Sequence, residues 1–182
     1  MRIDPIRFLD KKGREIELRA AVSSDADALI EYLKVVNVET PFLIREPDEC
    51  EMSHEDEEKF IQGKLDSERE ILLLALANGQ LAGNCSIQSL GSFKRLRHRC
   101  DVAIALYQEY CGCGIGRIML ETVLELAKKA HYEQAELEVV EGNDNAIVLY
   151  EKLGFKRYGT FPSNMKYADG SYRDAYWMMK KL

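Results

Sequence analysis

Three glycines at alternate positions, Gly112, Gly114 and Gly116, could hold a charged ligand against the backbone. They follow residues 101–106, an apolar run typical of a buried strand, and precede residues 115–130, where apolar side chains recur at helical spacing. A strand that turns into a helix leaves unpaired N–H groups at the helix start, where the helix dipole adds partial positive charge. Since glycine lets a ligand approach the backbone, this turn predicts a phosphate or pyrophosphate site.

The spacing of the glycines argues against two other nucleotide sites. The pattern is Gly-x-Gly-x-Gly, and Arg117 stands where a dinucleotide-binding fingerprint needs its last glycine. No Lys-Ser or Lys-Thr pair follows the turn, so it is not a P-loop.

A second motif begins about thirty residues later with Asn143, and continues with Ala146, Tyr150 and Gly154-Phe155. In this order, the two stretches closely resemble the two core motifs of the GNAT superfamily of acetyl-CoA-dependent N-acetyltransferases. The first motif of that family reads Arg or Gln, two residues, Gly, one residue, and Gly or Ala. It falls here on residues 111–116, with Cys111 in place of the usual Arg or Gln.

The resemblance implies a fold as well as an activity. The fold is α/β, a mixed and mostly antiparallel sheet of about seven strands, splayed at the acetyl-CoA site and flanked by about four helices. Residues 15–182 would form this single N-acetyltransferase domain, and residues 1–14 would be a lead-in. The activity is transfer of an acetyl group from acetyl-CoA to a primary amine, by direct attack in a ternary complex.

The resemblance also assigns the cofactor contacts. The pantetheine arm would lie in the splay beside residues 104–106, and the pyrophosphate would sit on the N–H groups of residues 111–117. Because backbone donors make most of this contact, binding is expected to survive the change at Cys111. The full expected set is Ile104, Ala105, Leu106, Cys111, Gly112, Cys113, Gly114, Ile115, Gly116, Arg117, Asn143, Ala146 and Tyr150.

Tyr150 is the candidate general acid for the departing thiolate, and a core aromatic is the alternative interpretation. A backbone N–H near Leu106 could stabilise the oxyanion. Asp101 and Glu138 flank the expected cleft and are candidate general bases, directly or through water, as is the nearby Glu141. Each of these carboxylates on its own is also typical of a strand surface. Asn143 could contact CoA, cap a helix, or do both.

Strands and helices must position these residues. Besides the strand and helix around the glycines, the sequence predicts strands at residues 15–19, 70–77, 81–90, 134–140, 155–161 and 172–179, and helices beginning near residues 26, 54 and 146. Asn78-Gly79 and Asp169-Gly170 are hairpin turns.

Three segments stay undecided. Residues 1–14 are either a disordered end or an added edge strand. Residues 39–52 form a long connection that either covers the substrate or simply packs. The basic cluster of Lys94, Arg95, Arg97 and Arg99 favours a solvated loop over a phosphate or acidic-partner site. Nothing in residues 39–52 or 161–173 identifies the acceptor amine.

Composition limits the remaining possibilities. The chain has 182 residues, 46% of them hydrophobic, and a formal net charge of −6, which argues against a broad nucleic-acid surface. No apolar run is long enough for a membrane span, and no signal peptide is recognisable at residues 1–10. Five irregularly spaced cysteines favour reduced thiols in the cytoplasm.

Other chemistries are less favoured. Isolated histidines at 54, 98 and 131 indicate no metal, and an acyl-cysteine route through Cys111 is disfavoured. The runner-up function is a catalytically inactive CoA-binding regulatory module. The partners expected are acetyl-CoA and an amine acceptor, with no nucleic acid and no membrane, and a homodimer is left open.

Overall fold

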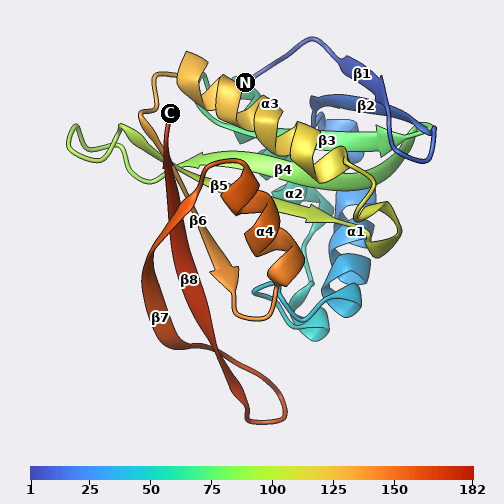
Figure 1. Ribbon diagram of the computed structural model, residues 1–182. Coiled ribbons are helices and arrows are strands. Elements are labelled where there is room, and N and C mark those ends of the chain that lie inside the picture. The colour runs from blue at the N-terminus through green and yellow to red at the C-terminus, as the bar shows by residue number, and fades with distance from the viewer.

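A mixed sheet of eight strands forms the centre of the molecule in a computed structural model that describes residues 1–182 (Figure 1). The strand order is β1-β2-β3-β4-β5-β6-β8-β7. The strands are β1 (Ile6–Leu9), β2 (Glu15–Ala20), β3 (Ile71–Ala77), β4 (Gln80–Ser89), β5 (Arg99–Leu106), β6 (Gln134–Val140), β7 (Lys156–Lys166) and β8 (Tyr172–Lys181). The α-helices are α1 (Ala26–Glu39), α2 (His54–Asp66), α3 (Ile115–Lys129) and α4 (Asp144–Lys152), with short 3-10 helices at Ser23–Asp25, Pro47–Glu49 and Gln108–Tyr110.

The expected fold is confirmed, with one strand more than the seven anticipated. The extra strand is β1, which lies in the lead-in and pairs antiparallel with β2 at the edge of the sheet. Of the two alternatives for residues 1–14, the structure therefore has the edge strand. No helix of the chain has both the length and the apolar character needed to cross a membrane.

The sheet is antiparallel except where β5 and β6 run parallel, and this pair is short. Only residues 99–101 of β5 are paired with β6, through residues 134–136, although β5 continues to Leu106 and β6 to Val140. The two strands therefore separate after Asp101. The backbone of β5 beyond this point has no neighbouring strand on the β6 side, which is the splay that the resemblance implies.

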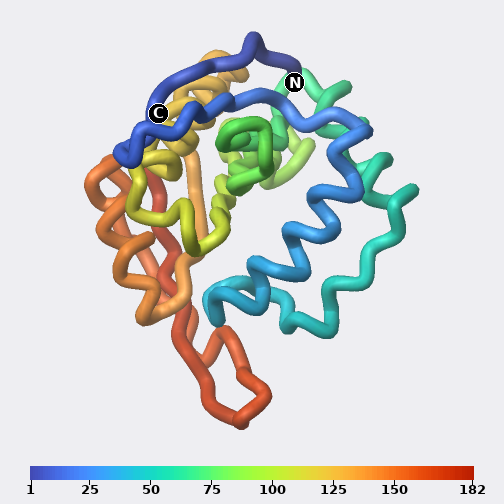
Figure 2. The backbone as a smooth tube through the Cα atoms, turned by 90° about the vertical axis from the view of Figure 1, so that its right-hand side faces the viewer, coloured from blue at the N-terminus to red at the C-terminus, as the bar shows by residue number.

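Helices cover both faces of the sheet. Helix α3 packs on β3, β4 and β5, whereas α1 and α2 pack on β4 and β3 (Figures 1 and 2). In Figure 1, α3 and α4 lie in front of the sheet and α1 and α2 behind it. Helix α3 can bury one stripe because Ile115, Met119, Val123 and Ala127 recur at helical spacing, and all four are buried.

The connection between α1 and α2 contacts the hairpin of β7 and β8. The Tyr167 hydroxyl donates to the carbonyl of Pro41 over 2.8 Å, and the Arg173 guanidinium lies 5.4 Å from the Phe42 ring centre. Figure 2 shows these two segments side by side below the sheet. The long connection is thus packed against the β7–β8 hairpin.

Candidate active site

The glycine turn has the backbone that the sequence predicts. Gly112 and Gly114 have φ values of 73° and 93°, in the left-handed region that favours glycine. Helix α3 begins directly after Gly114, so the first N–H groups of α3 have no partner within the helix. These donors and the dipole of a 15-residue helix favour an anion at this position.

Gly116 brings three elements together at the start of α3. A Cβ atom on Gly116 would lie 3.1 Å from Leu106 Cδ1, 3.6 Å from Ile104 Cδ1 and 3.8 Å from Leu149 Cδ2. The start of α3, the unpaired end of β5 and α4 therefore converge, with glycine at their closest approach. Acetyl-CoA fits this arrangement, because phosphates suit the helix start and an extended amide-containing arm suits the unpaired edge of β5.

Close packing also shapes the back of the splay. A Cβ atom on Gly83 of β4 would lie only 2.5 Å from the carbonyl oxygen of Ala105. No side chain fits there without moving backbone, so Gly83 lets β4 follow the end of β5. The expected cofactor residues of β5, the glycine turn and α4 are thus brought to one side of the molecule.

The two cysteines of the turn differ in their surroundings. Cys111 is exposed, with its Sγ 3.6 Å from the carbonyl oxygen of Tyr107, and Cys113 is buried. Partial desolvation raises the pKa of the Cys111 thiol, and Glu39 adds to the rise. Because a thiolate is the nucleophilic form of cysteine, this direction argues against an acyl-cysteine route.

Tyr150 lies on α4 and is buried, with its ring in edge-on contact with Phe155 at 5.9 Å between centres. Burial raises the pKa of the Tyr150 phenol, and Cys85 and Asp101 add to the rise. The phenol therefore keeps its proton at neutral pH. Asn143 precedes α4 and caps it only through its backbone, since its side chain makes no capping hydrogen bond. The Asn143 amide is thus free for another contact.

Asp101 occupies the last paired position of β5 before the splay. Burial, followed by repulsion from Glu136 and Glu138, raises the pKa of the Asp101 carboxyl to about 6. Both oxygens of Glu138 already accept hydrogen bonds, one from Trp177 Nε1 at 2.8 Å and one from Asn164 Nδ2 at 2.6 Å. Among the carboxylates that the sequence nominates, Asp101 thus has the surroundings best suited to a general base.

An aromatic cluster beside Glu138 was not anticipated from the sequence. Trp177 stacks on Tyr158 at 6.2 Å between ring centres and meets Phe161 edge-on at 5.8 Å. All three rings are exposed on β7 and β8. The one feature that could have pointed to this cluster is the position of Trp177 directly opposite Glu138. That position is known only once the register between β6 and β8 is known. Glu141 lies nearby, where its carboxylate accepts from the Tyr176 hydroxyl at 3.1 Å.

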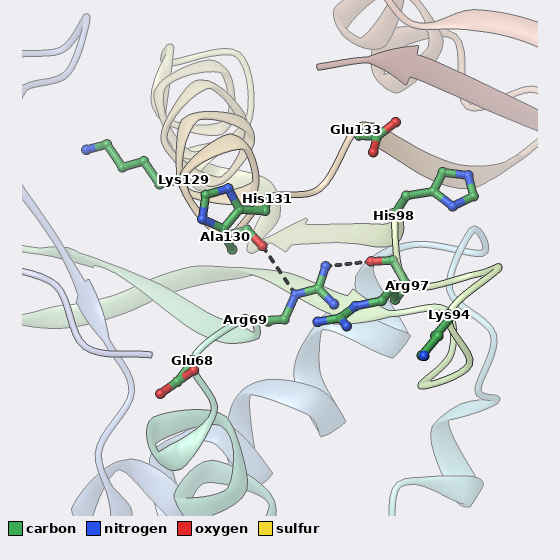
Figure 3. Close-up of a pocket in the computed structure, with 9 residues that line it drawn as sticks. All are labelled: Glu68, Arg69, Lys94, Arg97, His98, Lys129, Ala130, His131 and Glu133. Atoms are coloured by element: carbon green, nitrogen blue, oxygen red, sulfur yellow. Dashed lines mark hydrogen bonds between the residues drawn. The ribbon is translucent and has the colours of Figure 1, made fainter.

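A separate basic hollow of about 750 Å³ lies at the other end of α3 (Figure 3). It gathers Lys94 and Arg97 with Arg69 and Lys129, and two carbonyl groups hold the Arg69 guanidinium. Arg99 is not part of it, because Arg99 is a β5 residue paired with Glu136. Helix α3 is about 22 Å long at 1.5 Å per residue, so the hollow is remote from the glycine turn.

Comparisons with known proteins agree with this geometry. The profile of the acetyltransferase (GNAT) family matches residues 35–155. An N-alpha-acetyltransferase of Sulfurisphaera tokodaii is 30% identical over 174 residues, which is 94% of this chain and 96% of that protein. The N-alpha-acetyltransferase RimI of Mycobacterium tuberculosis is 33% identical over 58% of this chain and 63% of its own length. A crystal structure of a GNAT-family acetyltransferase from Streptococcus pneumoniae superposes with a TM-score of 0.88 at 31% identity, over 92% of this chain and 99% of that one.

Proposed function

This chain belongs to the GNAT family of acetyltransferases, and we propose that its acceptor is the α-amino group of a peptide or protein. The chain is an N-acetyltransferase that uses acetyl-CoA and a primary amine. The observation that carries the choice of acceptor is the match to the N-alpha-acetyltransferase of Sulfurisphaera tokodaii, which extends over nearly the whole of both chains.

The chemistry of the candidate base supports the same acceptor. An α-ammonium group has a pKa of about 8 and a lysine side chain one of about 10.4, so roughly 250-fold more of the α-amine is free at neutral pH. With a base whose pKa is about 6, the proton transfer is also less uphill from an α-ammonium group. Asp101 is therefore better matched to an N-terminal amine than to a lysine.

The surroundings of Glu138 suit a peptide N-terminus. Carboxylates at Asp101, Glu138 and Glu141 give this side of the cleft negative charge, which attracts an ammonium group. The exposed rings of Tyr158, Phe161 and Trp177 offer apolar contact for the first side chain of the peptide, and their faces attract a cation.

The residues divide the reaction as follows. Acetyl-CoA supplies the acetyl group as a thioester. Asp101 accepts a proton from the acceptor ammonium, directly or through water, and frees the amine for direct attack in a ternary complex. A backbone N–H near Leu106 donates to the carbonyl oxygen as it becomes negative. As the C–N bond forms and the C–S bond breaks, Tyr150 gives its proton to the sulfur. The second proton that the nitrogen loses in forming the amide returns through water to the Tyr150 phenolate, so the phenol is restored.

These roles also favour an enzyme over a binding-only regulatory module. Tyr150 is a buried, protonated phenol, and Asp101, whose charge adds to the rise in the Tyr150 pKa, has a carboxyl pKa of about 6. Such a pair favours proton transfer over binding alone. All five cysteines are free thiols, which supports a reducing compartment such as the cytoplasm.

A panel of acceptors tests the proposal. Thiol release from acetyl-CoA is measured with a peptide that has a free N-terminus and no lysine, and with the same peptide blocked at its N-terminus and carrying one internal lysine. Spermidine and an aminoglycoside complete the panel. We expect turnover with the free N-terminus, at least tenfold above the other acceptors, with the acetyl group located on the α-nitrogen by mass spectrometry. Faster turnover with the lysine peptide or with a small amine would exclude this acceptor class.

A further inference from the structure

The turn between β1 and β2, residues 10–14, packs against the glycine turn at the start of α3. The backbone N–H of Lys11 donates to the carbonyl of Cys113 over 3.1 Å. The Arg14 guanidinium lies 4.4 Å from the centre of the Tyr110 ring. Figure 2 shows the two turns side by side. The edge strand that was not assigned from the sequence thus brings a second turn to the expected phosphate site.

This N-terminal turn is internally fixed. The carboxylate of Asp10 is buried and accepts from the backbone N–H groups of Lys12 at 2.8 Å and Arg14 at 2.9 Å. Its other oxygen accepts from Arg14 Nε at 2.7 Å. Because Arg14 is paired with Asp10, the cations that the turn offers to a ligand are the exposed side chains of Lys11 and Lys12.

Of these two lysines, Lys11 lies over the glycine turn. A Cβ atom on Gly114 would be 3.7 Å from both Cγ and Cε of Lys11. The ammonium group is one bond beyond Cε, so the Lys11 side chain brings a positive charge beside the turn from which α3 begins. Arg117, the nearest cation on α3, is engaged with Glu121 at 2.8 Å.

We propose that Lys11 binds a phosphate group of acetyl-CoA and supplies the positive charge that Cys111 does not. This inference rests on the acetyl-CoA site assigned above and adds a residue from outside the family motif. The phosphate concerned is either the pyrophosphate or the 3′-phosphate, and a ligand that lacks the 3′-phosphate separates the two.

The test uses Lys11→Met, which keeps an unbranched stem over Gly114 and removes only the charge. Lys12→Met, in the same turn, is the matched control. Calorimetric titration measures the dissociation constants of CoA and dephospho-CoA at low and high salt, and thermal unfolding without ligand checks that both variants fold. We expect Lys11→Met to weaken CoA binding roughly 3–10-fold and to make it less sensitive to salt, with Lys12→Met within about twofold of the unchanged protein.

The ligand pair identifies the phosphate. Equal losses for CoA and dephospho-CoA indicate the pyrophosphate, and a loss confined to CoA indicates the 3′-phosphate. In the Lys11→Met background, Cys111→Arg should restore most of the affinity, because it returns the charge to the position where the family carries it. Equal affinities for Lys11→Met, Lys12→Met and the unchanged protein would overturn the inference and leave the acetyl-CoA site intact. If the unchanged protein bound no CoA, both would fail.

Discussion

Burial suits Tyr150 and Asp101 to the opposite roles that we propose for them. It raises the pKa of both groups, so that the Tyr150 phenol holds its proton and the Asp101 carboxyl titrates at about 6. A pair of groups with separated pKa values can act as acid and base at neutral pH. Tyr150 could be predicted from the motif around it, whereas the choice of Asp101 over Glu138 needed the hydrogen bonds that Trp177 and Asn164 donate to Glu138.

Tyr150→Phe tests the acid. Phenylalanine keeps the ring against Phe155, so folding and CoA affinity should change little. Turnover should fall roughly 10²–10⁴-fold, because only the proton donor for the thiolate is lost. Steady-state kcat and the CoA dissociation constant are the measurements. Near-normal kcat, with the chemical step shown to limit turnover, would favour the core-aromatic interpretation of Tyr150.

Asp101→Asn tests the base through its pH dependence. Because ionised Asp101 takes its proton from the acceptor ammonium, log(kcat/KM) should rise with a slope of about 1 below pH about 6 and level off above it. In the Asn variant the break near pH 6 should disappear and the rise should continue toward the pKa of the α-amine, about 8, with kcat/KM at neutral pH lowered by roughly 10²-fold or more. A break that stays near pH 6 in the variant would assign the base to another group.

The same raised pKa has a consequence for stability. Asp101 binds its proton more tightly in the folded state than in the unfolded chain, where its pKa is 3.8. Its contribution to stability is therefore fully present below pH 3.8 and is lost as the pH rises through about 6. At pH 8, Asp101→Asn should accordingly raise the free energy of unfolding by an amount of order 1–3 kcal/mol, seen as a higher unfolding temperature than that of the unchanged protein. At pH 4 the variant should show no such gain.

At the scale of elements, the sequence predicts which segments are strands better than where those strands part. Residues 101–106 and 134–140 both have the composition of buried strands, yet their pairing ends at Asp101 and Glu136. The end of pairing is a property of two strands that lie far apart in the chain, and the composition of either strand does not encode it. Strand β7 continues past its predicted end at Phe161. The register of β7 against β8 shifts after Phe161, and β7 is the edge strand of the sheet, so the missing N–H of Pro162 costs no hydrogen bond.

Tyr167→Phe tests the contact between the β7–β8 hairpin and the connection after α1. It removes only the hydroxyl that donates to the carbonyl of Pro41 and so links the hairpin to this connection. We expect the KM of the acceptor to rise about 2–10-fold, corresponding to one neutral hydrogen bond, with the KM of acetyl-CoA unchanged. Tyr172→Phe, an exposed change on the same hairpin, is the control. Equal effects of the two variants would mean that the contact does not order the acceptor site.

At the scale of the whole molecule, the proposed cofactor site joins three distant parts of the chain. The glycine turn and α4 follow from a motif that repeats the family pattern, which is why the fold and the cofactor could be predicted before the structure. Residues 10–13 carry a turn signal, but the place of this turn beside the site could not be predicted. It depends on contacts such as the hydrogen bond from Lys11 to Cys113, and no local pattern records a contact across a hundred residues.

Because one ligand contacts all three parts in the proposed site, acetyl-CoA should stabilise the protein as a unit. At a hundredfold excess over its dissociation constant, a ligand that binds only the folded state adds about 2.7 kcal/mol to the free energy of unfolding, which raises the Tm of a chain of this size by roughly 5–10 °C.

Gly114→Glu should abolish this rise in Tm, since it places bulk and like charge beside the pyrophosphate at a φ of 93°. Gly170→Glu is the matched control, because Gly170 also has a positive φ, of 83°, but lies in the open turn of the β7–β8 hairpin. Both variants should lose stability without ligand, and only Gly170→Glu should keep the ligand-induced rise in Tm. A full rise in Gly114→Glu would mean that acetyl-CoA binds somewhere other than the glycine turn.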